Sequence, residues 1–177
     1  MIKRKIIIMK KIIRKSLIIL MVLNLAVLIA GCSGGKETDS NTKSKTITID
    51  MEKLSSYLIK NIEFDGQMSS MSSEMAANVF DVSDLDVEMC VYMGTAPCRD
   101  MIAIFKTKDA NTMKDLKDRV EVYISDVKAQ TVDNGYDVSQ EKKFDNYVKK
   151  VLGDYYIVIL SPDNSAAAKT LDEAIEK

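Results

Sequence analysis

The stretch Val87-Glu-Met-Cys-Val-Tyr-Met-Gly94 decides the fold, because its apolar residues recur at every second position. This period of two is typical of a β-strand that has one face in the core. Gly94-Thr95-Ala96-Pro97 follows as a turn, and residues 99–106 return as a second strand. The stretch therefore predicts a β-hairpin.

Helical periodicity flanks this hairpin on both sides. Asp50 is a suitable N-cap for a helix, and Ser72 can cap a second, shorter one. Asp109 precedes the longest amphipathic segment of the chain. Its apolar stripe consists of Met113, Leu116, Val120, Tyr123, Ile124 and Val127. The chain thus predicts two helices before the hairpin and one long helix after it.

The order hairpin-helix then recurs. Residues 131–140 are polar and predict a loop, whereas residues 147–152 and 155–160 predict two strands joined at Gly153-Asp154. Ser161-Pro162 begins a final helix. A shift of 55 residues superimposes the two units, although any strand-cap-helix unit gives similar matches. We expect an α+β fold with a four-stranded antiparallel sheet built from two strand-strand-helix units, helices on one face, and two short N-terminal helices before them.

The N-terminal segment has the parts of an export signal. Seven basic residues lie before position 16 with no acidic residue among them, and residues 17–28 are apolar except for Asn24. This run is shorter than the roughly 20 residues that a membrane-spanning helix needs. Leu28-Ile29-Ala30-Gly31-Cys32 follows and resembles the lipobox of bacterial lipoproteins, in which the cysteine thiol is diacylated before cleavage on its amino side. An uncleaved anchor with a buried cysteine is the alternative.

These features predict three parts of the chain. Residues 1–31 are expected to be a lipoprotein signal peptide, and residues 32–45 a flexible tether that begins at a lipidated Cys32. Residues 46–177 are expected to form a single α+β domain. The chain has 25 basic and 26 acidic residues, and seven of the basic ones precede Cys32, so residues 32–177 carry a net charge of −8. This charge disfavours nucleic acid as a partner.

Four stretches together resemble a known family. They are Met89-Cys-Val-Tyr-Met-Gly-Thr-Ala, Ile102-Ala-Ile-Phe-Lys-Thr-Lys-Asp, the charged helix that follows, and Gly153-Asp-Tyr-Tyr-Ile-Val-Ile-Leu-Ser. The family is an uncharacterised group of lipoproteins from low-GC Gram-positive bacteria, domain of unknown function 4358, and the resemblance covers roughly residues 49–175. Its members tend to carry acidic residues before the second strand, where this chain has Arg99-Asp100. The resemblance implies a location on the outer face of the cytoplasmic membrane and an α+β fold, but no activity.

No catalytic, cofactor-binding or metal-binding residue is predicted. The chain contains no histidine, which removes the commonest general base and the commonest zinc ligand. No glycine-rich phosphate loop stands between a predicted strand and a helix. Asp81, Asp84, Asp86 and Glu88 lack the spacing of a calcium-binding loop, and we interpret them as solvated acids. We therefore expect no cofactor and no enzymatic activity.

Methionine is frequent in the first half of the predicted domain. Met68, Met71 and Met75 recur at helical spacing and predict a helix over residues 68–80. Core packing explains such a stripe best, ahead of an adaptable partner surface or a Cu(I) site.

Cys90 and Cys98 lie on the predicted hairpin. If Met93 pairs with Cys98, the two cysteines point to opposite faces of the sheet. Direct pairing of the cysteines would instead place Glu88 against Asp100, two like charges. We expect free, mostly buried thiols rather than a disulfide.

Tyrosine supplies a further candidate interaction surface. Tyr155 and Tyr156 are adjacent on a predicted strand, so one of them should project away from a one-sided core, near Tyr147. An ordinary solvated sheet face is the alternative. The sequence thus predicts a membrane-anchored extracytoplasmic lipoprotein, a non-catalytic binding or interaction module for a surface protein or peptide. A small-ligand-binding or carboxylate-based catalytic domain is the second hypothesis.

Overall fold

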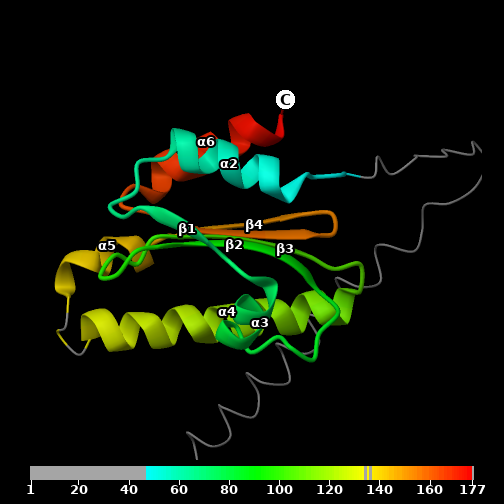
Figure 1. Ribbon diagram of the computed structural model, residues 1–177, viewed down its shortest axis with the longest axis horizontal. Helices are drawn as coiled ribbons and strands as arrows, with labels where there is room; N and C mark the ends of the chain where they lie inside the picture. The colour runs from blue at the N-terminus through cyan, green and yellow to red at the C-terminus, as the bar shows by residue number, and fades with distance from the viewer. Residues whose placement is uncertain (1–46, 134, 136, 177) are drawn as a thin grey trace, which may run out of the picture. The chain divides into compact units, whose positions relative to one another are not determined.

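A five-stranded antiparallel sheet lies at the centre of the fold (Figure 1). The computed structural model describes residues 47–133, 135 and 137–176. The strands are β1 (Met68–Met71), β2 (Glu88–Gly94), β3 (Met101–Lys106), β4 (Val148–Leu152) and β5 (Tyr155–Leu160). Their order in the sheet is β1-β2-β3-β5-β4. The predicted α+β class, with an antiparallel sheet, is confirmed, but the sheet has five strands rather than the predicted four. The predicted signal peptide, Cys32 and the tether lie outside the described residues.

Five α-helices accompany this sheet in the described part of the chain. They are α2 (Met51–Asn61), α3 (Ser73–Val79), α4 (Ala110–Lys128), α5 (Glu141–Phe144) and α6 (Asn164–Ile175). The predicted caps are confirmed: Asp50 and Asp109 accept hydrogen bonds from backbone N–H groups three residues on, at 3.1 and 2.7 Å, and Ser72 caps α3. The last helix is capped by Asp163.

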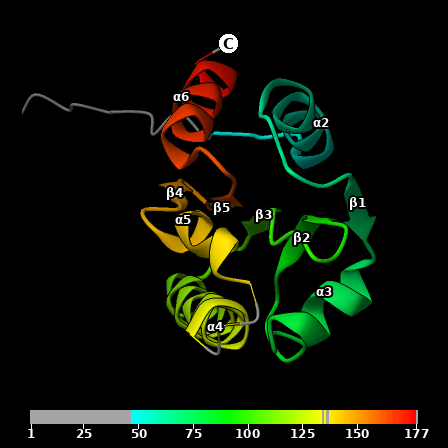
Figure 2. The ribbon, with the colours of Figure 1, turned by 90° about the vertical axis from the view of Figure 1, so that its left-hand side faces the viewer.

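The helices cover both faces of the sheet, which corrects the prediction of helices on one face. Figures 1 and 2 show α2 and α6 on one side and α3 and α4 on the other. Each face has its own apolar cluster, one around Leu58, Ile104 and Leu171, the other around Phe105 and Leu116. The reason is that every residue of β5 is buried, as are five of the six residues of β3. Strands that are apolar on both faces need cover on both.

The register of the β2–β3 hairpin differs from the predicted one. Met93 pairs with Met101 rather than with Cys98, and Cys90 pairs with Ile104. The turn is wider than expected, because residues 95–100 form a loop that contains a cis peptide bond between Ala96 and Pro97. Both cysteines are free: Cys90 is buried beside Ser55 of α2, and Cys98 is half-buried in the loop.

The predicted methionine helix is also wrong in its first half. Met68–Met71 forms the edge strand β1, which pairs with β2, and the helix begins only after Ser72. Met75 then lies on the outer side of α3 with 56% of its surface exposed. The polar stretch predicted as a loop includes a π-helical turn (Ala129–Asp133) that continues α4 and a 3-10 turn (Val138–Gln140).

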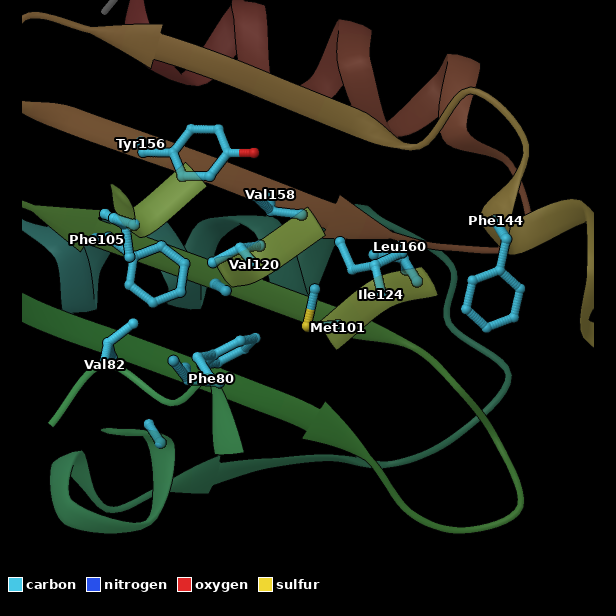
Figure 3. Close-up of a cluster of buried hydrophobic side chains, with 14 of the residues drawn as sticks. Phe80, Val82, Met101, Phe105, Val120, Ile124, Phe144, Tyr156, Val158 and Leu160 are labelled. Carbon is cyan, nitrogen blue, oxygen red and sulfur yellow. The ribbon is translucent and has the colours of Figure 1, made fainter. Parts of the chain in front are cut away.

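The cluster under α4 is built around aromatic rings (Figure 3). Phe80 contacts Phe105 edge-on, with ring centroids 5.2 Å apart, and Tyr123 at 4.7 Å. Toward the other end of the same layer, Figure 3 shows Ile124 beside Leu160. That end lies next to the β2–β3 loop and leads to the candidate site.

No helix among residues 47–133, 135 and 137–176 combines the length and the apolar character needed to cross a membrane.

Candidate functional site

The candidate site lies where the β2–β3 loop (residues 95–100) meets α5. Its centre is an ion-pair cluster that we call the Lys143 cluster: Lys143, Asp100 and Asp65. Lys143 Nζ lies 2.5 Å from Asp100 Oδ1 and 2.8 Å from Asp65 Oδ2. The side chains of Lys143 and Asp100 are 2% and 0% exposed, whereas that of Asp65 is half exposed. Such a buried pair is stable only when its remaining polar atoms are also bonded.

Backbone groups complete the hydrogen bonding of Asp100. Its Oδ2 accepts a hydrogen bond from the backbone N–H of Gly66 at 2.9 Å. Gly94 lies so close that a Cβ at this position would be 3.0 Å from Asp100 Cβ. A side chain at position 94 would therefore require Asp100 to shift by a few tenths of an ångström.

The backbone N–H groups of the loop are also bonded. Gly94 N–H donates to the carbonyl of Asp100 at 2.9 Å, and Cys98 N–H donates to the carbonyl of Thr95 at 3.1 Å. Arg99 N–H donates to Gln140 Oε1 at 3.3 Å, which ties the loop to the segment before α5. Together with the Lys143 cluster, these bonds fix the loop against the end of the sheet.

A cavity of about 90 Å³ lies beside this loop. Its polar lining comes from Cys98, Arg99, Asp100 and Tyr123. Its apolar lining comes from Met93, Met101, Ile124, Val127, Phe144 and Leu160. Figure 3 shows Met101, Ile124 and Leu160 close together at this end of the core, with Phe144 beside them.

Arg99 is the unusual residue of this cavity. Its Nε is buried and has no hydrogen-bond partner, and within the described residues no carboxylate pairs with its guanidinium group. Two lysines on the helices that border the cavity do have acidic partners, Asp100 for Lys143 and Asp145 for Lys128. An unpaired cation beside a cavity is suited to receive an anion.

Tyr123 faces the same cavity from α4. Burial raises the pKa of its phenol, and the positive charge of Arg99 opposes part of that rise. The hydroxyl donates only a weak hydrogen bond, to Met93 Sδ at 3.8 Å. Tyr123 therefore stays protonated near neutral pH and can exchange this bond for a stronger acceptor.

The predicted tyrosine surface is wrong. Tyr155 and Tyr156 are each only 3% exposed, because helices cover both faces of the sheet. Tyr155 lies on the α2 and α6 side, where its hydroxyl accepts a hydrogen bond from the backbone N–H of Ile49 at 3.0 Å. Tyr147 is half-buried and donates to Glu121 at 2.5 Å. The three residues thus form no shared exposed face.

Two of the four acidic residues around the start of β2 form ion pairs. Asp84 pairs with Arg119 of α4, which lowers the pKa of its carboxyl group, and Glu88 pairs with Lys106 across the hairpin at 2.6 Å. No group of three or more potential metal ligands occurs among residues 47–133, 135 and 137–176.

A second, wider hollow of about 830 Å³ lies between α2, α6 and residues 47–50. Its two charged lining residues, Asp50 and Lys53, pair with each other at 3.0 Å. It therefore offers no unpaired charge to a ligand, in contrast to the cavity beside Arg99.

No pattern in the sequence predicted that the residues of this site lie together. Asp65, Asp100 and Lys143 are far apart in the chain, and only the fold brings them together. One signal was present: β3 and β5 read as unbroken apolar runs, which indicates strands buried on both faces and argues against an exposed tyrosine surface.

Comparison with known proteins agrees with the family resemblance. The family described as domain of unknown function (DUF4358) matches residues 60–161, more than half of the chain. The chain belongs to this family. No curated protein and no solved structure matches it.

The Lys143 cluster leads to a prediction about stability. Lys143→Met should lower the free energy of unfolding by about 3–5 kcal/mol, because it leaves Asp100 charged and buried without its cationic partner. Adding Asp100→Asn should recover part of this loss. Lys142→Met, at the exposed neighbouring position, should change stability by less than about 0.5 kcal/mol. Urea denaturation of the four proteins measures the effect, and equal stability of the Lys143 and Lys142 variants would contradict it.

The burial of Tyr156 leads to a prediction about alkaline pH. Burial, with a smaller contribution from the charge of Glu121, raises the pKa of Tyr156 to about 12 from a usual value near 10. Its contribution to stability is complete below pH 10 and is lost as the pH rises toward 12, because the unfolded chain ionises first. Between pH 10 and pH 12, the free energy of unfolding of Tyr156→Phe should therefore fall by about 2 kcal/mol less than that of the wild type. Denaturation curves from about pH 9 to pH 12 measure the difference, and parallel curves would refute it.

Proposed function

We propose that this protein is an extracytoplasmic lipoprotein, anchored to the outer face of the cytoplasmic membrane through Cys32, whose folded domain is a non-catalytic module that binds a small ligand. The anchoring rests on the sequence: a basic and then apolar N-terminal segment ends at Cys32, followed by a polar tether. Binding rests on the cavity beside Arg99.

The single observation that carries the binding role is an unpaired, partly buried arginine at a cavity that is lined by both polar and apolar side chains. Ligand pockets combine an apolar lining with a few converging polar groups, and this cavity has both. The ion pairs of the Lys143 cluster hold the loop in place before any ligand arrives, which reduces the entropy lost on binding.

A small ligand is favoured over a surface protein or peptide. The sheet tyrosines that would have formed a partner surface are buried. The large apolar side chains that are exposed, such as Met75, Val122 and Val151, come from different elements and belong to neither apolar cluster. Isolated exposed apolar residues are usual on protein surfaces and do not mark an interface.

A non-catalytic role is favoured over carboxylate-based catalysis. Asp100 is the only carboxylate that lines the cavity, and both of its oxygens are occupied by Lys143 and Gly66. Acid–base catalysis by carboxylates needs at least one group free to exchange a proton with the substrate. The chain has no histidine that could take that role.

Anchoring can be tested by labelling with a fatty acid in a Gram-positive host. The wild type should incorporate the label in the membrane fraction, whereas Cys32→Ala should incorporate none and keep residues 1–31. Cys98→Ala is the matched control and should be labelled normally, since its thiol lies within the folded domain. Labelled Cys32→Ala, or unlabelled wild type, would refute the anchor.

Binding can be tested with a thermal-shift screen of the full protein, purified in detergent, against amino acids, organic acids, sugars and nucleotides. A ligand at ten times its Kd should raise the melting temperature by about 4 °C. Val127→Phe, which fills the cavity, should abolish the shift. Val122→Phe is the matched control on the exposed side of the same helix and should preserve it. No shift with any compound, or a shift unaffected by Val127→Phe, would refute the proposal.

A further inference from the structure

We infer that the ligand of the cavity is a small carboxylate with a short apolar chain, whose oxygens accept hydrogen bonds from Arg99 and Tyr123. This inference rests on the proposed binding role and specifies the chemical class that the site takes. Four observations lead to it: the charge at the cavity, the donors that are free, the lining and the size.

The unpaired charge at the cavity is positive. Arg99 has no acidic partner in the described part of the chain, whereas Asp100, the other charged residue of the lining, pairs with Lys143 at 2.5 Å. A buried nitrogen without a hydrogen-bond partner is unfavourable, so an anion that bonds to Arg99 Nε would remove this cost. The planar guanidinium group matches the two oxygens of a carboxylate.

The free donors at the cavity are few. Four backbone N–H groups around the loop already donate within the protein, those of Gly94, Thr95, Cys98 and Arg99. A phosphate group is usually held by several free backbone N–H groups or by more than one cation. Among the side chains of the lining, Arg99 and Tyr123 supply the donors for an anion, which suits a singly charged group with two oxygens.

The lining and the size restrict the rest of the ligand. Beyond the polar residues, the wall consists of aliphatic, methionine and phenylalanine side chains, including Ile124, Val127 and Phe144. An apolar cavity of about 150 Å³ holds benzene, so a cavity of about 90 Å³ has room for roughly four heavy atoms. Acetate, with four heavy atoms, therefore fits within the cavity, whereas propionate and butyrate, with five and six, would extend toward its opening.

Tyr123 and Arg99 both line the cavity that the carboxylate would occupy. The hydroxyl of Tyr123 is bonded only to a thioether sulfur. A carboxylate oxygen is a much stronger acceptor and would displace that contact.

The test is titration calorimetry of the full protein in detergent with acetate, propionate and butyrate, and with propionamide and phosphate for comparison. Propionate or butyrate should bind with a Kd in the millimolar range, as expected for so few atoms. Propionamide, which has the same shape without the charge, should bind at least about tenfold more weakly. Phosphate should not compete.

Two variants assign the binding to these residues. Arg99→Gln should weaken propionate binding by about tenfold, and Tyr123→Phe by a smaller factor. Lys108→Gln is the control: it removes one positive charge at the opposite end of β3 and should leave the affinity unchanged. The circular dichroism spectrum of each variant must match that of the wild type, and Arg99→Lys should retain part of the affinity.

Each other result counts against the inference. Equal binding of propionamide, full affinity in Arg99→Gln, or binding of phosphate without any carboxylate would overturn the assignment. So would the absence of binding by all three acids. If the acids fail while another compound produces a thermal shift that Val127→Phe abolishes, the ligand class is wrong and the proposed binding function stands. If no compound binds, both fail.

Discussion

The pairing of β3 with β5 is the constraint on which the rest of the structure depends. Ile104 lies opposite Ile157, and Phe105 lies opposite Tyr156, so the two central strands present apolar side chains to both faces. A sheet of this kind exposes apolar area unless helices cover each side, and burial of that area is the main favourable term in folding. The arrangement of α2 with α6 and of α3 with α4 follows from it.

The same pairing creates the site at the end of the sheet. The β2–β3 loop emerges where β3 begins, and α5 places Lys143 against it. A buried ion pair gains little stability over an apolar pair of the same size, because both charges lose their hydration. What the Lys143 cluster does provide is a fixed geometry, since Asp100 is bonded to Gly66 as well as to Lys143. A loop held in this way keeps Arg99 beside the cavity, although none of the described acidic residues pairs with Arg99.

Local signals in the sequence predicted the elements well and their assembly less well. Asp50 and Asp109 were identifiable because a cap and the apolar stripe after it act within one helix. β1 was missed because Met68, Met71 and Met75 fit a helical period equally well, and only pairing with β2 makes Met68–Met71 a strand. The Lys143 cluster joins three separate segments, so no local pattern could have indicated it.

The two strand-strand-helix units differ in the face of the sheet that their helices cover. Phe105 and Leu160 occupy equivalent positions near the ends of β3 and β5 and point to the same face. The helix that follows β3, α4, covers this face, whereas the helix that follows β5, α6, covers the opposite one. Because only α4 passes beneath the β2–β3 loop, Tyr123 and Val127 line a cavity there that the second unit does not reproduce.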